Sequence, residues 1–286
     1  MMISPSLTTL KLGLIGDNIS RSRSPRLHRL AGGMAGLEVT YDRLVPRDLE
    51  QSFEQVFAAA QEAGYRGLNI TYPYKERVVP LVAMTDPVLR SIGAVNTVLF
   101  EPGGPQGHNT DFTGFKAAYQ QVRGTAAPGE VLLIGTGGVG RAIAFGLADL
   151  GAEALRLVDR DTDKARALAD DLAQVFPDLP VTLCATAEAG AEGVRGLVNA
   201  TPVGMVGYEG TPLAAGSMAG AEWAFDAVYT PKDTRFLLDA ATSGLDIVSG
   251  WELFFYQGVH AWKLFSGSDA ALDELRQQLL VEAGDA

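Results

Sequence analysis

Short apolar runs alternate with stretches of helical period along most of the chain. In the first half, apolar runs predict strands at residues 11–15, 39–44, 67–70 and 94–100. Amphipathic stretches predict helices at residues 25–36 and 48–63. We expect Ser24 to cap the first helix, because it stands directly before Pro25. The glycine- and proline-rich residues 101–107 have the composition of a turn or loop.

The second half repeats this alternation from about residue 111 onwards. Apolar runs predict strands at residues 131–134, 154–158, 181–183, 196–198 and 223–227. Periodic stretches predict helices at residues 111–121, 139–150, 162–176, 250–265 and 270–282. The alternation predicts an α/β protein, and 286 residues are enough for two domains, 1–111 with 251–286 and 112–250. We expect the last helices to pack on the first domain.

A glycine-rich turn joins the strand at 131–134 to the helix that follows it. The turn has the G-x-G-x-x-G spacing and consists of Gly135, Thr136, Gly137, Gly138, Val139 and Gly140. Its first glycine allows a tight turn, its second lets a pyrophosphate approach, and its third allows close helix–strand packing. The helix N-terminus adds unpaired N–H groups. We therefore expect residues 112–250 to form a Rossmann-type, doubly wound dinucleotide-binding domain, although a structural glycine turn has the same spacing.

The next predicted strand leads into Asp159, Arg160 and Asp161. Asp159 lies 159 − 135 = 24 residues after Gly135, near the roughly 20 expected for an acid that binds ribose hydroxyls. A carboxylate there would repel a 2′-phosphate and favours NAD, whereas Arg160 could accommodate that phosphate. Since Asp161 adds negative charge, NAD is the favoured cofactor and NADP the alternative. Asp159 could instead be a helix N-cap.

Composition and charge narrow the function classes. A net charge of −11 argues against a nucleic-acid partner. No apolar run approaches the roughly 18 residues of a membrane helix, and residues 1–9 do not resemble a secretory signal. Cys184 is the only cysteine, which excludes an internal disulfide and fits a cytoplasmic location. The three histidines lack metal-ligand spacing, so we expect no metal; they are His28, His108 and His260.

Four polar motifs in the first half stand at or beside predicted strand ends, where α/β folds bind ligands. They are Ser20-Arg-Ser22-Arg-Ser24-Pro25, Asn69-Ile-Thr71-Tyr-Pro-Tyr-Lys75-Glu76, Gly93-Ala-Val-Asn96-Thr97 and Gly107-His-Asn109-Thr110-Asp111. Together they supply hydroxyls, amides, one amine and one carboxylate. This set suits a small substrate with many hydroxyl groups, since each hydroxyl needs a donor or an acceptor.

In this order, the four motifs, the glycine turn and a late glutamine resemble the shikimate dehydrogenase family, which includes NAD-linked quinate/shikimate dehydrogenases. The resemblance runs from about Gly13 to about Gly267. It implies reversible oxidation of a ring hydroxyl to a ketone with hydride transfer to the nicotinamide, and Lys75 and Asp111 as the catalytic pair. The chemistry agrees, because oxidising an alcohol requires a group that takes up its proton. By themselves, Lys75 could be a solvated lysine and Asp111 a helix cap.

The resemblance also implies that the substrate is a polyol carboxylate, and it indicates which side chains of the protein would bind it. Three side chains would hold the carboxylate: Ser22, Ser24 and Tyr229. Three more would bind ring hydroxyls beside Asp111: Thr71, Asn96 and Gln257. The segment with Thr201 would line the cofactor, and Gly250 would lie near the nicotinamide. From the residues alone, Tyr229 could equally be a core tyrosine and Gln257 an exposed glutamine.

Departures from the family pattern leave the substrate open. Phe112 replaces the usual glycine after N-T-D, Ser249-Gly-Trp-Glu-Leu253 replaces the usual D-G-x-x-M, and Asp159-Arg-Asp161 replaces N-R-T. Trp251, Glu252 and Leu253 therefore change the surroundings of the nicotinamide and the substrate. The resemblance associates serine at position 24 with shikimate and threonine with quinate. We therefore favour oxidation of shikimate to 3-dehydroshikimate, with quinate or aminoshikimate as alternatives. An inactive dinucleotide-binding regulator is the alternative from another class, and the protein is expected to be a monomer or a homodimer.

Overall fold

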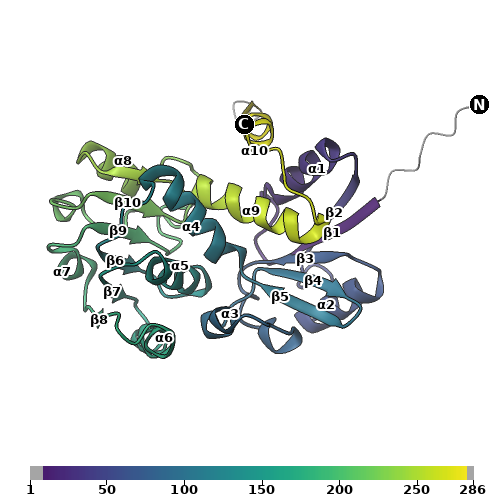
Figure 1. Cartoon of the computed structure of the whole chain (residues 1–286), viewed down its shortest axis with the longest axis horizontal. Helices are drawn as coiled ribbons and strands as arrows, with labels where there is room; N and C mark the ends of the chain where they lie inside the picture. Colours follow the sequence, from purple (N-terminus) through teal and green to yellow (C-terminus); the bar gives the residue numbers. More distant parts are fainter. Residues whose placement is uncertain (1–8, 282–286) are drawn as a thin grey trace, which may run out of the picture. The chain divides into compact units, whose positions relative to one another are not determined.

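The computed structural model describes residues 9–281, and the chain divides into two compact units (Figure 1). Unit 1 comprises Met1–Thr85, Ala94–Thr110 and Gly258–Ala286. Unit 2 comprises Asp86–Gly93 and Asp111–Gln257. Two helices, α4 (Thr110–Arg123) and α9 (Gly250–Ser266), contain points where the chain passes from one unit to the other.

Unit 1 is built on a mixed sheet of five strands in the order β2-β1-β3-β4-β5. The strands are β1 (Thr9–Ile15), β2 (Glu38–Leu44), β3 (Gly67–Ile70), β4 (Thr97–Glu101) and β5 (Gly104–His108). β1 is parallel to both β2 and β3, whereas β4 is antiparallel to β3 and β5. On one face, Ile15 packs with Phe53 of α2 (Phe53–Glu62). On the other, Leu12 packs with Phe265 of α9.

Two predicted helix starts in unit 1 are wrong. Ser24 is the first residue of α1 (Ser24–Met34) rather than its cap: Arg23 is the N-cap, and the Ser22 hydroxyl accepts from the Ser24 N–H at 3.3 Å. Helix α2 begins at Phe53 rather than at residue 48, because Ser52 and Gln55 form a reciprocal capping box there.

The loop predicted at residues 101–107 is mostly a strand. Glu101 pairs with Gly104 across a two-residue turn, and β5 continues to His108 as an edge strand. Pro105 is tolerated because an edge strand does not need every N–H for the sheet. The strand predicted at 94–100 is β4, which begins only at Thr97. Composition alone missed this hairpin because pairing with β4 outweighs the weak strand propensity of glycine and proline.

Unit 2 contains a parallel sheet of six strands in the order β11-β10-β9-β6-β7-β8. The strands are β6 (Glu130–Ile134), β7 (Ala154–Val158), β8 (Val181–Leu183), β9 (Gly196–Asn199), β10 (Trp223–Asp226) and β11 (Asp246–Val248). Read from β8, this is the 3-2-1-4-5-6 order of the Rossmann fold. The predicted doubly wound fold class is therefore confirmed.

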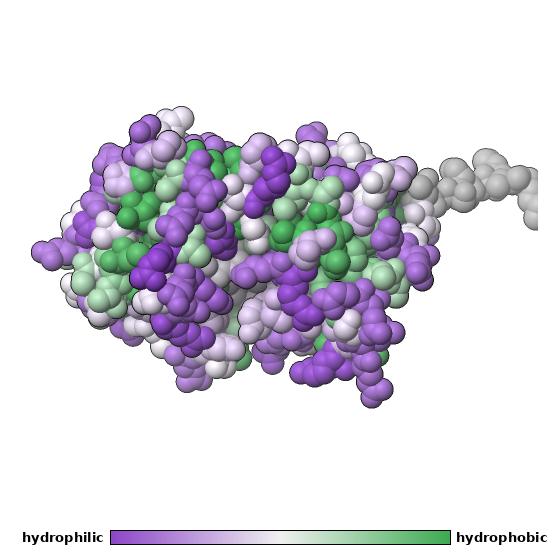
Figure 2. Space-filling model, turned by 90° about the horizontal axis from the view of Figure 1, so that it is seen from below, coloured by the Kyte–Doolittle hydropathy of each residue, from purple (hydrophilic) through white to green (hydrophobic). Residues whose placement is uncertain are grey.

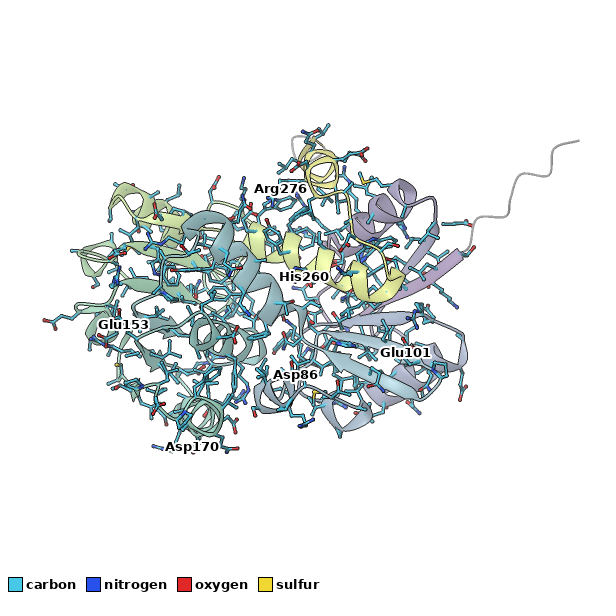
Figure 3. All side chains as sticks on the ribbon, viewed as in Figure 1. Asp86, Glu101, Glu153, Asp170, His260 and Arg276 are labelled. Atoms are coloured by element: carbon cyan, nitrogen blue, oxygen red, sulfur yellow. The ribbon has the colours of Figure 1, made fainter. Side chains whose placement is uncertain are left out.

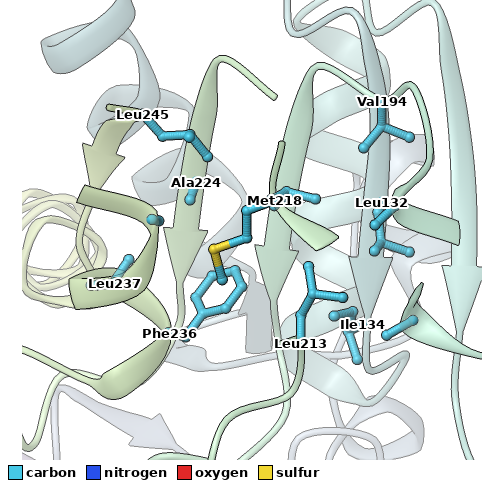
Figure 4. Close-up of a cluster of buried hydrophobic side chains, with 13 residues drawn as sticks. Leu132, Ile134, Val194, Leu213, Met218, Ala224, Phe236, Leu237 and Leu245 are labelled. Carbon is cyan, nitrogen blue, oxygen red and sulfur yellow. The ribbon is translucent and has the colours of Figure 1, made fainter. Parts of the chain in front are cut away.

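Helices cover both faces of this second sheet. They include α5 (Gly138–Asp149), α6 (Thr162–Val175), α7 (Ala187–Ala191) and α8 (Arg235–Thr242). On one face, Leu132 and Ile134 share a core with Phe236 and Leu237 of α8 (Figure 4). On the other, Phe115 of α4 packs edge-on against Phe225, with 5.1 Å between the ring centroids.

Four elements of unit 2 were not predicted: α3 (Pro87–Ile92), α7, α8 and β11. None exceeds eight residues, which is too short for periodicity to be read reliably. Asp86, labelled in Figure 3, begins α3 by accepting from the Val88 N–H at 2.8 Å. Arg141 of α5 donates to the Ile92 and Ser91 carbonyls at 2.5 and 2.9 Å, which explains why α3 belongs to unit 2.

The final helix, α10 (Leu272–Val281), contacts α1, so the expected return of the chain to the first sheet's unit is confirmed. Short 3₁₀ turns occur at Val79–Leu81 and Ala215–Ser217. Polar side chains are interspersed with smaller apolar areas on the face shown in Figure 2. Within residues 9–281, no helix is both long enough and apolar enough to cross a membrane.

Candidate active site

The residues of the four polar motifs that belong to unit 1, all except Gly93 and Asp111, lie at the same edge of its sheet. β1 is flanked by β2 on one side and β3 on the other, so the carboxyl end of β1 is a topological switch point. The loops that follow β1 and β3 carry Ser22 and Lys75. Because β4 is antiparallel and β5 reverses again, the start of β4 after Asn96 and the end of β5 before Thr110 lie at this edge too.

The loop after β3 is tied closely to its neighbours. Thr71 N–H donates to the Ile15 carbonyl at 2.9 Å, and the Tyr74 hydroxyl donates to Asp17 Oδ1 at 2.6 Å. The Lys75 carbonyl accepts from the Val95 N–H at 2.8 Å. Thr71 and Lys75 are both half-buried. The backbone that carries these two predicted site residues is therefore held between β1 and the start of β4.

Ser22 and Ser24 lie at the N-terminus of α1, and both are half-buried. Their hydroxyl oxygens are 3.2 Å apart and share a hydrogen bond. The Ser22 carbonyl accepts from Arg43 Nη2 at 2.9 Å, which holds this loop against β2. The helix N-cap, Arg23, makes no side-chain capping bond. The hydroxyls therefore stand at the positive end of the α1 dipole, which favours an anion.

Asn96 belongs to a buried polar network. Its Oδ1 accepts from the Thr110 N–H at 2.7 Å and its Nδ2 donates to Thr110 Oγ1 at 3.0 Å. Asn69 extends the network by donating to Thr97 Oγ1 at 3.2 Å and accepting from the Tyr41 hydroxyl at 2.8 Å. Only 3% of Asn96 is exposed. These bonds determine which way the Asn96 amide faces.

In unit 2, Asp111 and Gln257 are brought near one another by the contact between α4 and α9. Asp111 directly follows Thr110 and is buried in the first turn of α4. One turn later, Gly114 lies so close to α9 that a Cβ atom at Gly114 would be 2.7 Å from the backbone nitrogen of Gln257. Gln257 is half-buried, and its Nε2 donates to the Phe254 carbonyl at 3.1 Å. The glycine permits this close approach of the two helices.

Aromatic packing positions Tyr229. Its ring stacks on Phe254 of α9 with 5.1 Å between centroids and an interplanar angle of 15°. Trp251 packs against the same phenylalanine at 5.3 Å. Trp251 and Leu253, two of the residues that depart from the family pattern, are buried. Trp251 therefore forms part of the packing beneath Tyr229.

The glycine turn of unit 2 meets the requirements of a pyrophosphate cradle. Gly135 has a φ of +96° and lies against the segment after β9, where a Cβ would be 2.8 Å from Thr201 Cγ2. A Cβ at Gly140 would overlap the Gly135 carbonyl oxygen. Gly137 is the N-cap of α5 and has no side chain that could cap the helix. The space where its Cβ atom would be is open. This geometry fits a dinucleotide whose phosphates approach the first N–H groups of α5.

Asp159 is linked to the glycine turn. Its Oδ2 accepts from the backbone N–H and the hydroxyl of Thr136, at 2.7 and 2.8 Å. Burial by itself would raise the pKa of Asp159, but hydrogen bonds from Asp161 and Thr136 outweigh it and hold the pKa below its usual value. The alternative that Asp159 caps the next helix is wrong, because Asp161 is the N-cap of α6. Arg160 is exposed.

Sequence reasoning missed a buried carboxylate at the carboxyl end of β10. Asp226 is fully buried and accepts hydrogen bonds from Asn199, Val228 and Thr234. Burial raises the pKa of Asp226 to about 6, although the hydrogen bonds oppose this shift. The only available signal was its place three residues before Tyr229. Within residues 9–281, no group of three or more His, Cys, Asp or Glu side chains is arranged to hold a metal ion.

Comparison with known proteins identifies the family. Residues 14–98 match the model of the shikimate dehydrogenase substrate binding domain. The chain is 37% identical over 277 residues to a shikimate dehydrogenase (NADP(+)) of Pseudarthrobacter chlorophenolicus, covering 94% of each protein. The chain belongs to the shikimate dehydrogenase family. Family membership, predicted from the motifs, is therefore confirmed, and with it the assignment to the oxidoreductases.

Two further relatives within the shikimate dehydrogenase family are named for NAD and quinate. A quinate/shikimate dehydrogenase (NAD(+)) of Corynebacterium efficiens is 36% identical over 281 residues, which cover 95% of this chain and 98% of the relative. The solved quinate dehydrogenase from Corynebacterium glutamicum in complex with NAD superposes with a TM-score of 0.89 at 33% identity. That match covers 96% of this chain and 99% of the solved one.

Proposed function

We propose that this protein reversibly oxidises the ring hydroxyl of shikimate to 3-dehydroshikimate, with NAD preferred over NADP. The observation that carries the proposal is the meeting of the polar motifs of unit 1 at the carboxyl edge of its sheet, in a chain of this family. Within it, unit 1 is proposed to bind the substrate, and unit 2 to bind the dinucleotide. The family match to residues 14–98 supports the first assignment, and the strand order of the second sheet supports the other.

Lys75 and Asp111 are the proposed acid–base pair. The bound nicotinamide supplies the hydride acceptor. As the hydride leaves, the Lys75 amine takes up the hydroxyl proton, and the Asp111 carboxylate accepts a hydrogen bond from the reacting hydroxyl or from the amine. The tethered backbone of Lys75 and the buried position of Asp111 support these roles, because a positioned base must be held in place.

The substrate's carboxylate and hydroxyls need different partners. Ser22, Ser24 and Tyr229 are the proposed carboxylate ligands, and the positive end of the α1 dipole beside the serines supports an anion there. The proposed ligands of the ring hydroxyls are Thr71, Asn96 and Gln257. The network that orients the Asn96 amide supports its role, because a fixed amide distinguishes a donor from an acceptor.

The proposed cofactor site is the glycine turn with the strand ends around it. Its members are Gly135, Thr136, Gly137, Gly138, Val139, Gly140, Asp159, Arg160, Thr201 and Gly250. The low pKa of Asp159 keeps a negative charge beside the turn, which supports ribose hydroxyls over a 2′-phosphate. A cytoplasmic location and a monomeric or homodimeric state also stay predictions, the first resting on the single cysteine.

Initial rates with shikimate and quinate, each with NAD and NADP, test the proposal. We expect the highest kcat/KM with shikimate and NAD. Absence of turnover with all four combinations would contradict the proposal and favour a dinucleotide-binding regulator. Quinate is the second candidate substrate, because the relatives at 36% and 33% identity are named for quinate. A higher kcat/KM for quinate would assign the protein to that branch.

A further inference from the structure

We propose that Asp226 is a positioning residue that holds the cofactor-binding and substrate-binding loops of unit 2 in one common geometry. The inference rests on the proposed function, because it concerns residues assigned there to the two ligands. Asp226 is the last residue of β10, and its strand partner on β9 is Asn199. Both residues are fully buried.

The Asp226 carboxylate joins three separate segments. Its Oδ1 accepts from Asn199 Nδ2 and from the Val228 N–H, each at 2.9 Å. Its Oδ2 accepts from the hydroxyl of Thr234 at 2.5 Å, and Thr234 is the N-cap of α8. A carboxylate suits this position because it only accepts hydrogen bonds, and all three neighbours donate.

One branch of this network leads to the cofactor segment. Because Asn199 turns its amide nitrogen to Asp226, its Oδ1 faces Thr201 and accepts from the Thr201 N–H and hydroxyl, at 3.0 and 2.7 Å. The same amide nitrogen donates to the Val203 carbonyl at 3.0 Å. The orientation of the Asn199 amide, and with it the turn that carries Thr201, therefore depends on the carboxylate.

The other branch leads to the substrate segment. The N–H that Asp226 accepts belongs to Val228, the residue before Tyr229. Helix α9 begins against the residues that follow β10. A Cβ atom at Gly250 would overlap the carbonyl oxygen of Val228 and lie 2.7 Å from the carbonyl oxygen of Asp226. From there α9 supplies Phe254, on which Tyr229 stacks. The buried Asp226 side chain therefore anchors the turns that carry Thr201 and Tyr229, and its backbone carbonyl lies against Gly250.

Three variants test the inference against the wild-type enzyme. Asp226→Ala removes all three bonds, and Asp226→Asn keeps the shape of the side chain. Thr234→Val removes the bond to Oδ2 together with the capping bond that the Thr234 hydroxyl accepts from the Leu237 N–H. Asp246→Asn is the matched control, since Asp246 begins the neighbouring strand β11 and is paired with Arg123 at 2.5 Å. The measurements are kcat, KM for the polyol, the Kd of NAD by tryptophan fluorescence, and the melting temperature.

We expect Asp226→Ala to raise both the polyol KM and the NAD Kd about 10-fold, and Asp246→Asn to change neither. Asp226→Asn should recover part of the loss, because its amide oxygen can still accept from Asn199 and Val228. Double-mutant cycles add a readout that general destabilisation would not give. The effect of Asp226→Ala on NAD affinity should be non-additive with Thr201→Val, and its effect on polyol KM non-additive with Tyr229→Phe. If Asp226→Ala does not fold, the same cycles are run with Thr234→Val.

Unchanged KM and Kd values, or strict additivity in both cycles, would overturn the inference. An equal loss in Asp246→Asn would do so as well, because it would show that any lost carboxylate in this unit has the same effect. Failure of the proposed function gives a different result: the wild-type protein then turns over neither polyol. In that case the NAD affinities and the cycle with Thr201→Val still test the role of Asp226.

Discussion

Lys75 is held by its backbone to the segment before β4, whereas its side chain is proposed to do chemistry. Lys75→Ala should therefore lower kcat by about 10²–10⁴ through loss of the proton acceptor, with little change in NAD affinity. Steady-state rates and a fluorescence titration with NAD check both parts. Lys263→Ala is the control, because that lysine is exposed on α9 and paired with Asp269. An unchanged kcat in Lys75→Ala would refute the catalytic assignment.

Asp159 carries the prediction about cofactor choice. Replacing it with alanine removes the negative charge beside the glycine turn, so NAD binding should weaken much more than NADP binding. Dissociation constants for the two cofactors measure the ratio. Asp161→Ala, which removes the cap of α6 and a negative charge that does not contact the glycine turn, should change that ratio much less. An equal loss for both cofactors in Asp159→Ala would show that the residue acts only by holding Thr136.

Most of the individual site residues could be predicted from the sequence, but the hydrogen-bond partners that hold their side chains in place could not. Three glycines could be predicted because the local backbone of the turn requires a residue without a side chain at each position: Gly135, Gly137 and Gly140. The partners of Asp159 were not predicted: Thr136 lies 23 residues away in the chain, and nothing in spacing identifies it as the donor. The same applies to Asp226, whose donors Asn199 and Thr234 come from two other segments.

At the scale of elements, the contact of α4 with α9 depends on Gly114. A Cβ atom at Gly114 would be 2.7 Å from the backbone nitrogen of Gln257 and 3.0 Å from the Cβ atom of Gln257. Gly114→Ala should therefore destabilise the protein by about 1–3 kcal/mol through overpacking and raise the polyol KM, because Asp111 and Gln257 flank this contact. Urea unfolding and steady-state kinetics measure the two effects.

Gly33→Ala is the matched control for this helix contact. Gly33 lies in α1 with nothing within 4 Å of where its Cβ would be. The substitution should stabilise the helix by about 0.5–1 kcal/mol and leave KM unchanged. If both variants behaved alike, the loss in Gly114→Ala could not be attributed to the contact with Gln257.

Long periodic elements were predictable, whereas short ones and several boundaries were not. Helices α4, α6 and α9 each span 14 residues or more, so their apolar stripe repeats several times. The start of α2 was placed too early, since the residues before Ser52 are turn residues and only the capping box marks the boundary. The strand β5 was missed because its residues are weak strand formers that pair with β4 as an edge strand.

At the scale of the whole molecule, His28 makes stability depend on pH. It is buried, stacks on Tyr41 at 5.2 Å, and has no hydrogen-bond partner for Nδ1. Burial lowers the pKa of His28 to about 3, against a smaller opposing effect of a hydrogen bond with Asn69. The unfolded chain therefore binds a proton near pH 6.5 that the folded chain rejects. This contribution to stability is present above pH 6.5 and is lost as the pH falls towards 3.

The prediction is that His28→Phe flattens the fall in unfolding free energy below pH 6.5, where His28 contributes up to about 1.4 kcal/mol per pH unit. Asp226 acts in the opposite direction, because folding raises its pKa from 3.8 to about 6. Its contribution to the unfolding free energy therefore falls as the pH rises from about 4 to about 6. The difference between His28→Phe and wild type, measured by urea unfolding from pH 4 to 8, isolates the histidine. Parallel curves would contradict the assignment.

The sequence by itself determined the alternation of strands and helices, the glycine turn, the order of the polar motifs and the family. These follow from local rules: apolar periodicity, turn chemistry, and residue types at fixed spacing. Only the tertiary structure decided that α3 belongs to unit 2, that β5 pairs as an edge strand, and that Asp226 joins three segments. The physical reason is that burial and hydrogen-bond partnership arise between residues far apart in the chain, and spacing along a single sequence does not encode which of them meet.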